Sequence, residues 1–249
     1  MAHKAKGIIA QSEGASVAFL LIHGFGASSD ELATLQTTLS DYGYSSFAIQ
    51  LAGHGSTPED FKESTWRDWY ESAKSGLDLV RSWNTKYIII VGFSMGGLLA
   101  ALLAAEQRRF DGLVLIAPAI KIPGTLFKLV PFMKLFMKWR EVDVEAAQRV
   151  YDIKRFKLAR EPVSAYHELS KLQKKVKKNL QNIEIPTLIL QGTDDKTVDP
   201  DGAKIILDGI SSKMKELQFI PGAEHVISCH PTRAVAYPHI LRFIEQVTD

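Results

Sequence analysis

Residues 87–105 read YIIIVGFSMGGLLAALLAA, and this stretch decides the fold. An apolar, Ile-rich run is followed by Gly-x-Ser-x-Gly at residues 92–96 and then by a run of Ala and Leu, an order that predicts strand, sharp turn and helix. A residue at such a turn has strained backbone, so Gly92 and Gly96 flank Ser94 where Cβ atoms would clash. The stretch therefore predicts a nucleophile elbow that lifts Ser94 above the edge of a sheet.

The predicted helix after Ser94 adds an electrostatic feature to this turn. Its first N–H groups and the positive end of its dipole face the serine, which suits a developing oxyanion. Gly-x-Ser-x-Gly is a weak signal by itself, because an ordinary strand–turn–helix connection also satisfies it. The apolar run before it and the alanine-rich run after it supply the context that an elbow requires.

Length and composition indicate a soluble α/β protein. The chain has 249 residues, 46% of them hydrophobic, which suits one α/β domain with an insertion and a large core. Cys229 is the one cysteine, so no intrachain disulfide can form. We find no zinc-ligand spacing and no dinucleotide loop, and expect no metal and no cofactor. The sequence has neither a signal peptide nor an apolar run of membrane-spanning length, so we expect a cytoplasmic protein.

Charge is distributed unevenly along the chain. Residues 121–178 hold 15 Lys and Arg against 6 Asp and Glu, whereas the rest holds 15 against 22. Such a shift, without repeats or low-complexity sequence around it, marks an inserted subdomain. We predict a core formed by residues 1–119 and 186–249, and a helical cap, without strands, formed by residues 120–185.

Outside the cap, short apolar runs alternate with helical patterns. This alternation predicts a mostly parallel sheet with helices on both faces, in which ligands bind beyond the carboxyl ends of the strands. Ser28-x-x-Glu31 resembles a capping box at the start of one helix. The predicted strands, besides the apolar run that begins at Tyr87 and leads into Gly-x-Ser-x-Gly, are residues 16–22, 46–51, 113–117, 187–191 and 217–220.

Within the cap, residues 126–139 combine large apolar side chains with regularly placed lysines. The ordinary interpretation is an amphipathic helix docked by its apolar face. A sharper hypothesis is that Met133, Phe136 and Met137 bind an acyl chain while the lysines make transient contact with a lipid surface. The basic run at residues 171–178 lacks interleaved aromatic residues, which indicates a solvated helix face and no nucleic-acid partner.

A serine hydroxyl needs a positioned base before it is nucleophilic at neutral pH, and the base needs an acid to orient it. His225 follows the last predicted strand, where a base can reach Ser94, and we predict it as the general base. His230 is the nearest rival. His23 precedes a second glycine loop, and His54, between two glycines, suits a structural hydrogen bond.

The acid is expected in residues 191–200, which follow a buried strand. Spacing alone leaves Asp194 and Asp195 as alternatives, while Asp199-Pro200 is typical of a helix start. In either case the chain order is Ser, Asp, His. This order is that of α/β-hydrolases and differs from those of chymotrypsin-like and subtilisin-like proteases.

Three ordered motifs, His23-Gly24-Phe25-Gly26, residues 92–97 and Gly222-x-x-His225, make the whole chain resemble the α/β-hydrolase superfamily. Its size, cap and elbow sequence are similar to those of small bacterial carboxylesterases and monoacylglycerol lipases. The resemblance implies Asp195 as the acid, with Asp194 as the fallback. It also implies an oxyanion hole formed by the backbone N–H groups of Phe25 and Met95, with Phe25 at the substrate.

The resemblance implies a serine hydrolase that cleaves small-molecule carboxylic esters with a hydrophobic acyl group through an acyl-enzyme. Thioesterase, lactonase and carbon–carbon bond hydrolase activities use the same triad and stay as alternatives. A haloalkane dehalogenase or an epoxide hydrolase would have Asp in place of Ser94. A non-catalytic ligand-binding protein on this fold is the remaining alternative.

Overall fold

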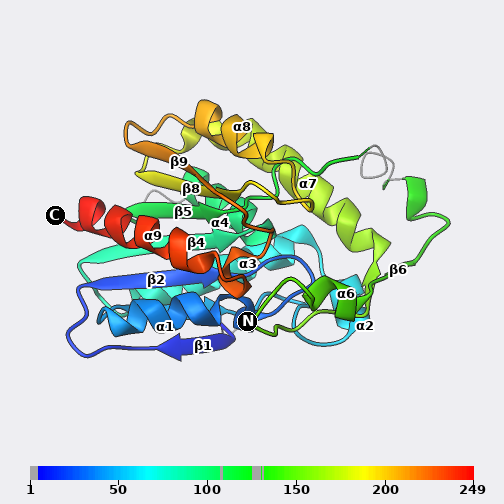
Figure 1. The fold of residues 1–249 in the computed structure, drawn as a ribbon, viewed down its shortest axis with the longest axis horizontal. Helices are drawn as coiled ribbons and strands as arrows, with labels where there is room; N and C mark the ends of the chain where they lie inside the picture. Colours follow the sequence, from blue (N-terminus) through cyan, green and yellow to red (C-terminus); the bar gives the residue numbers. More distant parts are fainter. Residues whose placement is uncertain (1–4, 107–108, 125–129, 131) are drawn as a thin grey trace.

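The computed structural model describes residues 5–106, 109–124, 130 and 132–249. Its centre is a seven-stranded sheet in the order β1-β3-β2-β4-β5-β8-β9 (Figure 1). All neighbouring strands are parallel except β1, which pairs antiparallel with β3. The strands are β1 (Gly7–Ala10), β2 (Val17–Ile22), β3 (Ser45–Ile49), β4 (Tyr87–Phe93), β5 (Gly112–Ile116), β8 (Thr187–Gly192) and β9 (Lys215–Ile220).

Helices cover both faces of this sheet, which confirms the predicted fold class. Figure 1 shows α1 (Ala33–Asp41) and α9 (Arg233–Thr248) in front of the sheet. Their apolar side chains form one core layer with the strand residues that face them. The second layer contains α3 (Trp66–Arg81), α4 (Met95–Glu106), α7 (Val163–Asn179) and α8 (Asp201–Gly209). Because the sheet is buried on both faces, its central strands are almost continuously apolar.

Two short elements were not predicted from the sequence. The edge strand β1 has only four residues, and Ile8 and Ile9 are about half exposed, so it lacks the buried pattern of the central strands. The helix α2 (Pro58–Glu63) begins with a capping box between Thr57 and Asp60. Its six residues are too few for an apolar periodicity to be recognised.

The insertion contains two strands, so the expectation of a cap without strands is wrong. β6 (Trp139–Glu141) and β7 (Arg160–Pro162) pair antiparallel, with α6 (Val144–Gln148) between them in the sequence. Three-residue strands rich in charged residues carry no hydrophobic alternation, which explains why the pattern was missed. Figure 1 shows α6 and β6 on the side of the sheet where β2 ends.

Three 3-10 helices complete the described elements: η1 (Ser29–Leu32), η2 (Leu180–Asn182) and η3 (Ile227–Cys229). The first follows the loop after β2 and the third follows the loop after β9, so both lie next to strand ends. In the described part of the chain, no helix combines the length and the apolar content needed to cross a membrane.

Candidate active site

Ser94 lies at a sharp turn between β4 and α4, with φ of +54°. This left-handed conformation is uncommon for a residue with a side chain. The backbone around it is packed too closely for other side chains: a Cβ atom on Gly92 would lie 2.3 Å from Gly96 O, and one on Gly96 would lie 2.1 Å from Ile22 O. The two glycines are therefore required by the close contact of the backbone around them.

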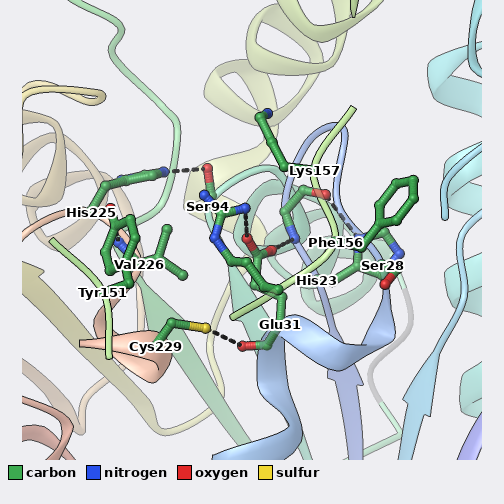
Figure 2. Close-up of polar contacts among 12 residues, drawn as sticks. His23, Ser28, Glu31, Ser94, Tyr151, Phe156, Lys157, His225, Val226 and Cys229 are labelled. Carbon is green, nitrogen blue, oxygen red and sulfur yellow. Dashed lines mark hydrogen bonds and ion pairs between the residues drawn. The ribbon is translucent and has the colours of Figure 1, made fainter. Parts of the chain in front are cut away.

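Three side chains from separate strand ends form a continuous chain of hydrogen bonds. His225, in the loop after β9, has its Nε2 atom 2.9 Å from Ser94 Oγ, as Figure 2 shows. Its Nδ1 atom lies 2.7 Å from Oδ2 of Asp195, which follows β8. All three residues are buried. The ring of Phe93 packs 5.0 Å from the imidazole, centroid to centroid, and helps to fix its orientation.

The carboxylate of Asp195 is held by four donors. Oδ1 accepts hydrogen bonds from the N–H groups of Thr197 and Val198, and Oδ2 accepts one from Gln191 Nε2 as well as from His225. Burial by itself raises the pKa of this carboxyl, but the hydrogen bonds, led by that of His225, outweigh it, so the pKa of Asp195 lies below its usual value. Asp195 is therefore ionised at neutral pH.

The structure separates the alternatives that the sequence left open. Asp194 is exposed, and its Oδ1 accepts a hydrogen bond from Thr193 Oγ1. The Nδ1 atom of His230 bonds Thr232, and that of His54 bonds Ala52 O. None of these three side chains hydrogen-bonds Ser94 or His225 among the described contacts.

The loop after β2 lies beside the elbow, because Ile22 pairs with Gly92 in the register of β2 and β4. Phe25 and Met95 each follow these paired residues by three positions, so both lie beyond the same edge of the sheet. The Nδ1 atom of His23 donates to Gly24 O at 2.8 Å, and its Nε2 atom accepts from Leu51 N–H at 3.2 Å.

His23 is neutral in this arrangement. Burial lowers its pKa, and the acceptor role of Nε2 leaves the proton on Nδ1. Because the C=O of Gly24 and the N–H of Phe25 belong to one trans peptide, the hydrogen bond from His23 also orients the N–H of Phe25, which points away from the imidazole.

A cavity of about 690 Å³ opens at Ser94 and His225, and the insertion supplies much of its wall. Met133, Met137 and Phe25 line it. Phe136 does not: its side chain is 90% exposed and lies outside the lining, which corrects its assignment to the substrate site. Met133 is half-buried and faces the cavity, whereas Phe136, three residues later, lies in solvent. Residues 125–129 and 131 of the predicted amphipathic stretch lie outside the described residues.

One corner of the cavity is polar and was missed in the sequence. The buried carboxylate of Glu161 bonds Lys157 Nζ and the hydroxyl of Tyr166, and lies 3.3 Å from Arg140 Nη1. This corner adjoins the loop after β2, since a Cβ atom on Gly26 would lie 2.8 Å from Glu161 Oε1. The one available signal was the i, i+4 spacing of Lys157 and Glu161.

Two other features of the site differ from what the sequence predicts or are not predicted from it. The capping box predicted for Ser28 and Glu31 is wrong: Ser28 makes no side-chain cap, and Glu31 Oε2 accepts from Gly24 N–H at 2.8 Å. Gln191, which holds Asp195, was recognisable only as a polar residue at the end of an apolar strand. Over the described residues, no three His, Cys, Asp or Glu side chains are grouped as metal ligands.

Comparison with known proteins finds related hydrolases over most of the chain. The sequence profile of the Hydrolase_4 family (serine aminopeptidase, S33) matches residues 14–231. A thermostable monoacylglycerol lipase of Bacillus sp. (strain H-257) is 29% identical over 86% of this chain and 85% of its own. A carboxylesterase of Bacillus subtilis (strain 168) is 24% identical over 94% and 95%, and the human monoglyceride lipase is 26% identical over 82% and 74%.

Solved structures show the same fold. A structure reported for the metagenome-derived lipolytic enzymes LipS and LipT superposes with a TM-score of 0.88 at 24% identity, covering 98% of both chains. A soluble variant of monoglyceride lipase from Saccharomyces cerevisiae, in complex with a substrate analogue, gives 0.79 at 20% identity over 94% of this chain and 88% of its own. The chain therefore belongs to the serine aminopeptidase S33 (Hydrolase_4) family of the α/β-hydrolase superfamily.

Proposed function

We propose that this chain, a carboxylic ester hydrolase, cleaves esters of apolar acyl groups with Ser94 as the nucleophile, His225 as the general base and Asp195 as the orienting acid. The observation that carries the proposal is the 2.9 Å contact between Ser94 Oγ and His225 Nε2 at the base of an apolar cavity. A serine with its base in hydrogen-bond reach, and that base held by a buried carboxylate, is the arrangement that nucleophilic catalysis needs.

The reaction proceeds by two acyl transfers. Ser94 Oγ attacks the ester carbonyl carbon while His225 accepts its proton, and the ionised Asp195 stabilises the imidazolium that forms. The N–H groups of Phe25 and Met95 hold the tetrahedral oxyanion. The imidazolium then protonates the departing alkoxide oxygen, which leaves as the alcohol. Water, deprotonated by His225, attacks the acyl-enzyme, and the second tetrahedral intermediate releases the acid as His225 returns the proton to Ser94 Oγ.

The two halves of the cavity suit the two halves of a monoacylglycerol. Met133, Met137 and the apolar residues around them suit an acyl chain, while the corner formed by Lys157, Glu161 and Tyr166 offers hydrogen bonds to a polyol. A simple alkyl alcohol group would make no hydrogen bonds to these polar side chains. The names of the monoacylglycerol lipase and carboxylesterase relatives agree with this substrate class.

The outer face of the insertion supports transient contact with a lipid surface. Phe132, Leu135 and Phe136 are 67%, 70% and 90% exposed and lie close to Met133 and Met137 of the cavity wall. Lys134 and Lys138 lie in the same stretch and are exposed. Apolar side chains flanked by lysines are typical of surfaces that bind anionic lipid.

The substitution Ser94→Ala tests the proposal. We expect it to lower the hydrolysis of p-nitrophenyl butyrate by at least about 10⁴-fold and to abolish labelling by a fluorophosphonate probe, because only Ser94 supplies the attacking oxygen. Circular dichroism should stay unchanged. Full activity or labelling in the variant would reject Ser94. Parallel assays with a thioester, a lactone and an amino-acid p-nitroanilide separate the alternative hydrolase activities from ester cleavage.

A further inference from the structure

We infer that Glu31 is a positioning residue for the oxyanion hole, and that Arg155 of the insertion makes this role compatible with catalysis by neutralising its charge. The inference rests on the proposed function, in which Phe25 N–H is an oxyanion donor. It adds two residues that do not touch the reacting atoms.

Glu31 holds the loop that carries Phe25. Its Oε2 atom accepts the N–H of Gly24 at 2.8 Å, and a Cβ atom on Gly24 would lie 3.0 Å from the same oxygen. Gly24 O accepts from His23, so both sides of Gly24 are fixed by buried side chains. The peptide that presents Phe25 N–H is thus held by His23 at its C=O group, and the peptide before it is held by Glu31 at the N–H of Gly24.

Arg155 connects this carboxylate to the insertion. Its Nη1 atom lies 2.9 Å from Glu31 Oε1, and the two side chains are only 7% and 3% exposed. A second contact runs in parallel, because Asp30 Oδ2 accepts the N–H of Phe156 at 2.7 Å. Two consecutive residues of the short helix η1, Asp30 and Glu31, therefore bind two consecutive residues of the insertion, Arg155 and Phe156.

The opposite side of η1 is bound to the segment that follows His225. The main-chain oxygen of Glu31 accepts a hydrogen bond from Ser228 Oγ at 2.6 Å and contacts Cys229 Sγ at 3.7 Å, as Figure 2 shows for the latter. Glu31 thus contacts the oxyanion loop, the insertion and the segment after His225 at one point. A displacement of this residue is transmitted to the loop that carries Phe25.

The charge of Glu31 explains why Arg155 is needed. Glu31, Arg155 and Ser94 line the same cavity, and the bond to Gly24 sets the carboxylate one residue from the proposed donor Phe25. An unpaired negative charge there would oppose the negative charge that develops on the oxyanion in the low dielectric of the cavity. Paired with Arg155, the carboxylate still accepts the hydrogen bond from Gly24 N–H, and the guanidinium offsets its negative charge.

The pairing of Glu31 with Arg155 predicts that a second substitution, at Glu31, raises the kcat that a substitution of Arg155 has lowered. Arg155→Met leaves an uncompensated carboxylate, whereas Glu31→Gln combined with Arg155→Met removes the charge and keeps an oxygen acceptor for Gly24 N–H. We therefore expect Arg155→Met alone to lower kcat by about 10- to 100-fold with KM changed by less than about 3-fold. The double variant should recover most of that loss.

The experiment measures kcat and KM with p-nitrophenyl butyrate, the inhibition constant of an alkyl boronic acid that forms a tetrahedral serine adduct, and the urea midpoint of each variant. Glu31→Leu with Arg155→Met serves as a second double variant. It has the same charge as the Glu31→Gln double variant and differs in lacking the acceptor, so we expect a lower kcat and weaker boronate binding than in the Gln form.

Arg233→Met is the matched control, because Arg233 Nη1 lies 2.6 Å from Asp152 Oδ1 and also ties the insertion to the core, away from the oxyanion loop. It should leave kcat unchanged. Overturning results are a double variant no better than Arg155→Met, an effect confined to KM, or equal kcat in the Gln and Leu double variants. If Arg155→Met alone does not fold, the comparison of the two double variants, with Gln or Leu at position 31, still tests whether the acceptor at Glu31 positions the oxyanion loop. An active Ser94→Ala variant would refute the proposed function itself.

Discussion

The central sheet and residues 139–162 of the insertion, two regions that meet at the cavity, are held by different forces. Ser94 and Asp195 follow strands whose central residues, such as Ile90 in β4 and Ile189 in β8, are completely buried, and His225 follows the edge strand β9. Residues 139–162 of the insertion carry several charged pairs to the core, whereas helix α7 of the insertion packs against α4 with buried apolar side chains. The charged pairs include Glu31 with Arg155, Asp152 with Arg233 at 2.6 Å, and Glu59 with Arg160 at 2.5 Å.

This difference teaches which part of the site is rigid and which part is adjustable. Close-packed strands hold the strand ends through apolar burial, which is not screened by salt and is costly to disturb. Exposed ion pairs contribute little and are screened by salt, so the attachment that they give residues 139–162 is weak, with the buried pair of Glu31 and Arg155 as the exception. Substitutions at the strand ends should therefore affect chemistry, and those in the insertion should affect substrate choice, apart from Arg155, which acts on chemistry through Glu31.

The largest effect is expected at the acid. Asp195→Asn should lower kcat by about 10⁴-fold, because the amide can no longer stabilise the imidazolium or fix its tautomer. Asp194→Asn is the matched control and should retain wild-type kcat, since Asp194 is exposed and bonds Thr193. Steady-state kinetics with p-nitrophenyl butyrate measures both. A crippled Asp194 variant beside an active Asp195 variant would reverse the assignment.

A smaller but still large effect is expected at the elbow glycine. Gly96→Ala places a Cβ atom 2.1 Å from Ile22 O and 2.5 Å from His23 O, both backbone atoms. The backbone must shift, so we expect a loss of about 1–3 kcal/mol in the free energy of unfolding and about 10²-fold in kcat.

Gly112→Ala in β5 is the control for this substitution, because its Cβ would meet only side-chain atoms, the nearest being Phe243 Cε1 at 3.3 Å. Urea unfolding and kinetics distinguish the two. If the two alanine variants were equally stable and active, the close packing of the elbow would have no catalytic consequence.

The polar corner of the insertion should change selectivity by about tenfold. Glu161→Gln removes the charge that Lys157 and Arg140 share and weakens the hydrogen bonds offered to a polyol. We expect kcat/KM to fall about tenfold for a monoacylglycerol relative to the p-nitrophenyl ester of the same acid. Both substrates are measured on the same preparation, so any loss of folded protein cancels in the ratio. An unchanged ratio would remove the corner from the alcohol site.

The smallest effect is expected on the outer face of the insertion. Phe136→Ser should weaken sedimentation with vesicles that contain phosphatidylglycerol by about 3- to 10-fold, because one exposed aromatic side chain is lost from the contact. Its activity on water-soluble p-nitrophenyl butyrate should not change. Val235→Ser, half exposed on α9, serves as the control. Equal vesicle binding by both variants would argue against a lipid contact at this face.

The elbow and the order of the site residues were predictable because each depends on local sequence. Gly92 and Gly96 flank Ser94 at a turn that has no room for a Cβ atom at either glycine, and the buried strands appear as apolar runs. Position after a strand then identified His225 and limited the acid to two neighbouring aspartates. The choice of Asp195 needed a family resemblance, because the side chains of two adjacent residues point in different directions while both residues lie at nearly the same distance from the strand in the sequence.

Only the tertiary structure decided the contacts between segments that lie far apart in the chain. Glu31 resembled a helix cap, yet its carboxylate bonds Gly24 and, 124 residues later in the sequence, Arg155. The exposed position of Phe136 and the polar corner at Glu161 depend likewise on how the insertion docks. Sequence periodicity reports which residues share a face of one element, whereas the partner of a buried charge is set by the packing of several elements.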